Sequence, residues 1–140
     1  MKQKFTYLII AALLTLFSTA AWSFDLSGEW TLKIENLDHK PVASLKVRFT
    51  QEAAVSCLAG SWRRVDVASP TTTNESFFPV TDPLSYQIEN STLTIGRNQV
   101  CDAYLHLDGS INELPIHGDY VEFGITGGSK KGYFSLTRNK

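Results

Sequence analysis

The sequence predicts an all-β protein, an antiparallel up-and-down barrel of about eight strands. Three observations support this. Short segments alternate apolar and polar residues, turn residues separate these segments at short spacing, and no amphipathic helix of useful length follows residue 24. Each strand would have one apolar and one polar face, which also fits a β-sandwich, so the sandwich remains the alternative.

Residues 1–23 are expected to be a secretory signal peptide and residues 24–140 the single barrel domain. Met1-Lys2-Gln3-Lys4 is basic, residues 5–17 are apolar, and Ala21 and Ser23 are the small residues of a cleavage site before Phe24. An uncleaved anchor is the alternative, because residues 5–24 carry no charge. The short apolar stretch and the cleavage site favour a secreted or periplasmic bacterial protein with no membrane span after cleavage.

The mature chain would contain 117 residues, enough for one domain that buries roughly two-thirds of its unfolded surface. Without Lys2 and Lys4, 11 basic residues face 14 acidic ones, a net charge of −3. This mild negative charge gives no electrostatic reason to expect a nucleic acid or an anionic membrane as partner.

The first expected strand surrounds Trp30. Trp30, Leu32 and Ile34 alternate with polar residues, as in a half-buried strand. Gly28 removes side-chain bulk where the strand begins, and Trp30 is expected to fill one end of the core.

Residues 45–49 and 55–67 are the next expected strands, the latter with a bend at Gly60. Residues 69–83 then lose all periodicity and contain Pro70, Pro79 and Pro83, so we expect a long loop.

The second half of the chain consists of short alternating segments: residues 84–88, 93–95, 101–107, 121–125 and 132–138. A turn at residues 127–129 would make a hairpin of the last two. The expected inward-facing residues are Trp30, Leu32, Ile34, Leu45, Val47, Phe49, Leu105, Val121, Phe123, Ile125, Phe134 and Leu136.

Cys57 and Cys101 are the only cysteines. In an exported chain two cysteines allow one intramolecular bridge, and we expect it to form rather than leave two buried thiols.

Gly28-x-Trp30 on the first strand, followed by a meander that ends in Arg138, resembles the calycins: lipocalins, fatty-acid-binding proteins and avidins. The resemblance implies that Arg138 packs over the indole of Trp30, a favourable cation–π pair. A second lipocalin motif, Thr-Asp-Tyr, is absent. Only Trp30 and Trp62 remain after residue 23, which is few for an avidin-type biotin pocket.

Small barrels either fill their interior with side chains or hold one ligand. We expect an exported binding protein for a small apolar or amphipathic molecule, with Phe77, Phe78, Trp62 and Arg64 as candidate ligand-binding residues. The alternative is a protein-binding or inhibitor module with a solid core, whose partner is another exported protein. Phe77-Phe78 would be either a plug over the barrel or an outward contact surface. The oligomeric state stays open.

We expect no catalytic residue, metal or cofactor. His106-x-Asp108 and His117-x-Asp119 have metal-ligand chemistry, but adjacent glycines explain both aspartates as turn residues. Residues 127–132 lack the Gly-Lys-Ser/Thr of a phosphate loop. Arg63-Arg64 could meet an anionic ligand, although a solvated strand edge is the simpler interpretation.

Overall fold

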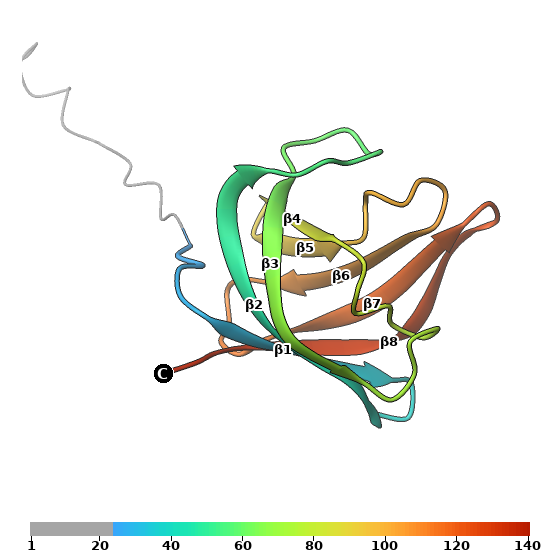
Figure 1. Cartoon of the computed structure of the whole chain (residues 1–140), viewed down its shortest axis with the longest axis horizontal. Helices are drawn as coiled ribbons and strands as arrows, with labels where there is room; N and C mark the ends of the chain where they lie inside the picture. The colour runs from blue at the N-terminus through green and yellow to red at the C-terminus, as the bar shows by residue number, and fades with distance from the viewer. Residues whose placement is uncertain (1–23) are drawn as a thin grey trace, which may run out of the picture.

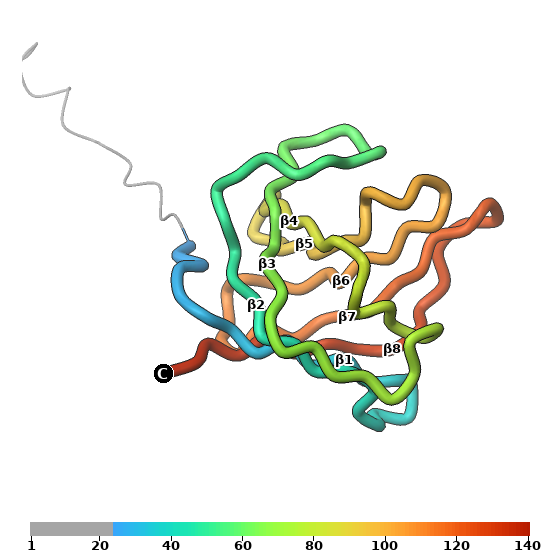
Figure 2. Tube along the Cα trace, viewed as in Figure 1, coloured from blue at the N-terminus to red at the C-terminus, as the bar shows by residue number. Residues whose placement is uncertain are grey.

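The computed structural model describes residues 24–140, which form a closed antiparallel β-barrel (Figures 1 and 2). Each strand pairs with the next along the chain, and the first pairs with the last. The expected fold class is therefore confirmed. The strands are β1 Trp30–Asn36, β2 Pro41–Ala53, β3 Arg63–Thr72, β4 Leu84–Glu89, β5 Thr92–Gly96, β6 Tyr104–Ser110, β7 Ile116–Gly124 and β8 Gly127–Arg138.

The register around β1 explains why the barrel closes. Leu32 lies opposite Leu45 on β2 and Leu136 on β8, and Ile34 lies opposite Phe134. Residues directly opposite in a sheet point to the same face, so alternate apolar residues of three strands converge on the interior.

Large side chains fill the middle of the barrel. Twelve are almost fully buried: Trp30, Tyr120, Phe78, Leu32, Ile34, Leu45, Leu93, Ile95, Leu105, Leu107, Ile116 and Leu136. Close packing of this kind leaves no room for a ligand at the centre.

The disulfide Cys57–Cys101 forms, as expected, with a Cα–Cα distance of 5.6 Å. The bridge joins the β2–β3 loop to the β5–β6 loop. The same two loops are also connected by a hydrogen bond from the Cys57 N–H to the Asn98 carbonyl at 2.8 Å. The strand expected from residue 55 is wrong, because residues 54–62 are this loop and β3 begins only at Arg63.

The expected inward face of β7 is also wrong. Tyr120 is buried, whereas Ile125 is 103% exposed at the turn into β8. Val121 and Phe123 are half-buried, and the Phe123 ring contacts His106 on the outer face, 5.0 Å between centroids. Both faces of this strand carry large residues, and the face that contains Tyr120 points into the barrel. The register of β7 against β8 shifts directly after Tyr120.

The loop between β3 and β4 covers one end of the barrel, which we call the plugged end; it lies away from the C-terminus in Figure 1. This loop is shorter than expected, because β3 continues to Thr72 and the covering segment is residues 73–83. Phe78 is fully buried in the core and Phe77 is half-buried against it. The Tyr120 hydroxyl donates to the Phe77 carbonyl at 2.6 Å.

The proposed signal peptide, residues 1–23, lies outside the described residues. Within residues 24–140, no helix is long and apolar enough to cross a membrane.

Candidate functional site

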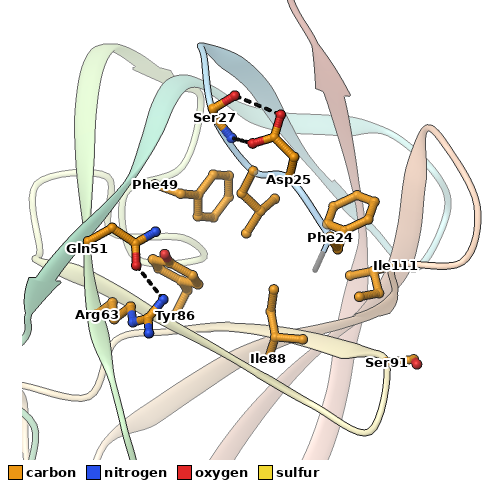
Figure 3. A pocket seen from close by; sticks show the side chains of 11 residues that line it. Phe24, Asp25, Ser27, Phe49, Gln51, Arg63, Tyr86, Ile88, Ser91 and Ile111 are labelled. Atoms are coloured by element: carbon orange, nitrogen blue, oxygen red, sulfur yellow. Dashed lines mark hydrogen bonds between the residues drawn. The ribbon is translucent and has the colours of Figure 1, made fainter. Parts of the chain in front are cut away.

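A cavity of about 680 Å³ opens at the other end of the barrel, beside Trp30, which we call the mouth (Figure 3). The ends of β2 and β4, the start of β3 and the segment before β1 surround it. Its lining residues are Phe24, Asp25, Leu26, Ser27, Phe49, Gln51, Arg63, Tyr86, Ile88, Ser91 and Ile111. Cavities of about 300–1,000 Å³ are typical of small-molecule sites.

The pleat of the strands explains which side chains reach this cavity. On β2, Val47 is buried, and the next residues on its face are Phe49 and Gln51. Arg63 starts β3 directly opposite Tyr86 of β4, so both side chains lie on the same face of the sheet. These faces are apolar in the core and become polar at the rim, so the cavity has apolar depth and a polar edge.

The rings of Phe49 and Tyr86 form the floor of the mouth, and the fully buried Trp30 packs behind Phe49. The Phe49 ring lies edge-to-face with Trp30, 6.3 Å between centroids, and with Tyr86, 5.0 Å between centroids. The Tyr86 hydroxyl donates to the Thr50 carbonyl at 2.8 Å. Edge-to-face contacts hold such rings in fixed positions, so the floor is preformed.

Polar groups lie on both sides of the cavity: Gln51 and Arg63 on one side, and Asp25 and Ser91 near Phe24 and Ile111 on the other (Figure 3). The Arg63 guanidinium donates to the Gln51 side-chain oxygen at 2.5 Å. Figure 3 shows this pair on one side and Phe24 and Ile111 on the opposite side. The Arg63–Gln51 pair and the two apolar side chains across from it suit a molecule with a polar end and an apolar end.

Residues 24–29, which we call the strap, cross the mouth before β1 begins. The Trp30 indole N–H donates to the Leu26 carbonyl at 3.1 Å, and Trp30 itself is fully buried. Gly28 has φ +88° and no atom within 4 Å of the place a Cβ would occupy. It is therefore required for the backbone turn into β1, and not to save space as the sequence suggested.

Arg138 connects the strap to the barrel. Its guanidinium carbon lies 4.9 Å from the Trp30 ring, and its Nη2 donates to the Asp25 backbone carbonyl and carboxylate. The Ser27 backbone N–H and hydroxyl also donate to this carboxylate. These hydrogen bonds, the Ser27 N–H first, lower the pKa of the Asp25 carboxyl.

Two of the four residues proposed for binding, Phe77 and Phe78, lie under the plugged end. The Tyr120 ring contacts both edge-to-face, with centroids 5.4 Å from Phe77 and 5.6 Å from Phe78. Burial, with a smaller contribution from the nearby Glu122, raises the pKa of the Tyr120 hydroxyl to about 12. The two phenylalanines thus belong to a packed cluster.

The other two, Trp62 and Arg64, lie outside the barrel interior. Trp62 is 6% exposed; its indole N–H donates to the Ala59 carbonyl at 3.1 Å. Arg64 is exposed and pairs with Glu52 at 2.7 Å and Asp66 at 2.9 Å. The structure therefore does not bring the four candidates into one cavity, and a binding role for each stays a prediction.

His106 lies beneath Trp62 in a chain of hydrogen bonds. Its Nε2 contacts the fully buried Asn98 at 3.0 Å, Asn98 donates to Ser85 at 3.1 Å, and Ser85 donates to the Gly96 carbonyl. Burial lowers the pKa of His106, although nearby Asp108 opposes this. Because the Ser85 hydroxyl proton is directed to a carbonyl, this chain is not arranged to activate a nucleophile.

The two His-x-Asp pairs have other partners. Thr94 donates to Asp108 at 2.7 Å, and Asp119 pairs with Lys130 at 2.7 Å. Among residues 24–140, no three His, Cys, Asp or Glu side chains come together as metal ligands would.

Gln51, Tyr86 and the strap were not singled out by the sequence analysis, and Arg63 was named only together with Arg64, as a possible contact for an anionic ligand. A signal for Gln51 exists, because the alternation of residues 45–49 simply continues to it. For Arg63 the signal was misread: Arg63 and Arg64 were treated as one solvated edge, whereas neighbours on a strand face opposite sides. Arg63 lines the mouth and Arg64 faces away from it.

Comparisons of the chain with protein-family models, curated proteins and solved structures find no match. The fold and the cavity define the class: a closed up-and-down barrel, compatible with a calycin-like architecture, with one plugged end and one hollow end. The site is therefore interpreted from its own residues and geometry.

Proposed function

We propose that the protein is an exported calycin-like barrel that binds one small apolar or amphipathic molecule in the mouth. The observation that carries this proposal is the cavity of about 680 Å³ with an aromatic floor and a polar edge. The contact of Arg138 with the buried Trp30 gives the calycin resemblance its structural support.

Aromatic side chains explain the affinity expected of such a site. Phe24, Phe49, Ile88 and Ile111 line the cavity and are each partly exposed, so an apolar ligand would remove their surfaces from water. Burial of apolar surface contributes about 25 cal/mol per Å² before the costs of binding are subtracted. The floor needs no rearrangement to receive a ligand, which keeps those costs low.

Export to the periplasm or the medium is part of this proposal. The Cys57–Cys101 disulfide supports it, because such bridges persist in oxidising compartments. The sequence of residues 1–23 supports it independently.

Native mass spectrometry of the protein purified from its host tests the function. We expect a bound species with extra mass, lost from the variant Ile88→Trp, which fills the cavity at a 38% exposed position. Ile125→Trp, at an equally apolar but fully exposed turn, is the matched control and should keep the bound species. A protein that carries no ligand and also binds no member of an amphiphile panel would contradict the proposal.

The filled barrel interior favours a second candidate function, a protein-binding module acting through its loops. Leu114 and Ile125 are loop residues that are 61% and 103% exposed. This alternative predicts a stoichiometric complex with another exported protein that Leu114→Ser or Ile125→Ser weakens and Ile88→Trp leaves unchanged. Size-exclusion chromatography with light scattering on the purified pair would measure this.

A further inference from the structure

We infer that the mouth selects an amphipathic anion, with a carboxylate held by Arg63 and an apolar chain directed toward Phe24 and Ile111. This inference rests on the proposed function and specifies its ligand class. It starts from the charge of Arg63, which no carboxylate among residues 24–140 contacts.

Arg63 differs from the other four arginines of the chain. Each of those contacts a carboxylate: Arg48 with Glu29, Arg64 with Glu52 and Asp66, Arg97 with Asp82, and Arg138 with Asp25. Among the described residues Arg63 has no carboxylate within 4 Å, and residues 1–23 contain no acidic residue. Its guanidinium hydrogen-bonds only a neutral amide oxygen, that of Gln51.

Arg63 lies where a bound ligand could supply the missing carboxylate. Arg63 lines the cavity, directly opposite Tyr86 in the sheet, whereas its neighbour Arg64 is paired on the outer face. A guanidinium offers five N–H donors in a planar fork that matches a carboxylate in a bidentate way. Gln51 uses one edge of it, so donors remain for an incoming anion.

The lining contains one acidic group, Asp25, which could in principle favour a cation. Its carboxylate already accepts hydrogen bonds from Ser27 and Arg138 in the strap. Of the two charged side chains that line the cavity, Arg63 has no carboxylate partner, whereas Asp25 is paired with Arg138. An amphipathic cation would be repelled by the unpaired Arg63, and the one carboxylate of the lining is already paired with Arg138.

The apolar part of the ligand has a defined place. Phe24 and Ile111 lie on the side of the cavity opposite Gln51 and Arg63 (Figure 3). A molecule with its charge at Arg63 therefore extends its chain across the aromatic floor toward these residues.

The test uses three ligands with the same ten-carbon chain: decanoate, decanol and decylammonium. Isothermal titration calorimetry at neutral pH and low salt should give decanoate an affinity at least about tenfold above decanol, as expected for a charged hydrogen bond. Decylammonium should bind weakest. The decanoate advantage should shrink as salt is added, because salt screens a partly exposed ion pair.

Arg63→Met keeps the length of the side chain and removes its charge, so it should abolish the preference for decanoate over decanol. Arg64→Met, one residue away on the outer face, should retain the full preference. Near-UV circular dichroism confirms that both variants fold, and Arg63→Gln provides the same test if the Met variant does not.

The outcomes separate the two proposals. Equal binding of all three ligands to the unmodified protein would overturn the anion preference and leave the binding function intact. A loss of decanol and decanoate affinity by the same factor in Arg63→Met would also overturn it, because Arg63 would then only shape the cavity. Binding of none of them, together with no ligand on the host-purified protein, would overturn both.

Discussion

The two ends of the barrel are covered by different segments, and only one of these segments closes its end completely. At the plugged end, residues 73–83 insert Phe78 into the core, and the Tyr120 hydroxyl holds the segment by the Phe77 carbonyl. At the mouth, the strap packs Leu26, which is 7% exposed, into the core and Phe24 against it, but these side chains leave a cavity. The cavity between the strap, Phe49 and Tyr86 stays open.

The ion pair that attaches the covering segment is less exposed at the plugged end than at the mouth. Arg97 and Asp82 at the plugged end are 15% and 33% exposed, and Arg97 also donates to the Ala103 carbonyl. Arg138 and Asp25 at the mouth are 43% and 66% exposed. The plugged end is therefore built for stability, whereas the mouth keeps apolar surface and a free guanidinium accessible. Four experiments test this contrast.

Trp30→Ala should have the largest effect, because Trp30 is fully buried and supports the floor of the mouth. We expect a loss of about 3–5 kcal/mol of unfolding free energy, from lost burial and the remaining cavity. Urea denaturation measures it. Arg138→Ala, which removes the group over the indole together with its exposed hydrogen bonds to Asp25, should cost less, about 1 kcal/mol. A Trp30→Ala protein as stable as the parent would contradict this role.

Phe78→Ala and Phe49→Ala compare the two ends directly. Phe78 is fully buried, so its truncation should cost about 3–5 kcal/mol and leave ligand affinity in the folded protein unchanged. Phe49 is half-buried and lines the cavity, so its truncation should cost less stability and weaken binding. Denaturant melts and ligand titrations of both variants give the two readouts. Equal losses of stability with no change in binding would remove the distinction between the ends.

Tyr120→Phe and Tyr86→Phe each delete one hydroxyl that donates to a backbone carbonyl, Phe77 at the plugged end and Thr50 at the mouth. Each should cost about 1 kcal/mol, the net value of one such hydrogen bond. Tyr120→Phe should also increase amide exchange in residues 73–83, which Tyr86→Phe should not. Hydrogen exchange followed by mass spectrometry distinguishes them, and unchanged exchange in both variants would show that the hydroxyl does not hold the plug.

The smallest expected effect is the pH response of the strap. Because hydrogen bonds lower the pKa of Asp25 in the folded protein, its contribution is complete above the ordinary aspartate value near 3.9 and is lost as pH falls through the lowered pKa. NMR spectra should therefore show no change in residues 24–27 between pH 7 and 5 and a loss of order only in stronger acid. Asp25→Asn should lose the dependence, and a transition near neutral pH would contradict this account.

Much of the barrel could be predicted from the sequence because strand pairing follows local alternation. The patterns around Trp30, Leu45 and Leu105 identify three strands, and the core contains the residues they predict. The disulfide followed from the number of cysteines and the proposed compartment. In β7 the same reasoning failed, because the more apolar alternation, Val121 and Phe123, follows a register shift after the buried Tyr120 and is only half-buried.

The candidate site could be predicted only in part. Loop composition singled out Phe77 and Phe78, but their aromatic surface is compatible with both a plug and a contact surface. The structure buries Phe78 completely. For Arg63 an anionic contact was considered but a solvated edge was preferred, because a polar residue at the rim of a barrel looks the same in sequence as one on its outer surface.

By itself, the sequence determined the periodicity of the strands, the presence of a bridge and an aromatic residue at one end of the core. Periodicity depends on residues close together in the chain, and the bridge was expected from the number of cysteines. Only the tertiary structure decided which end of the barrel is filled and which arginine lacks a partner. Those properties depend on contacts between distant segments, such as Asp25 with Arg138 and Phe77 with Tyr120, which no local pattern encodes.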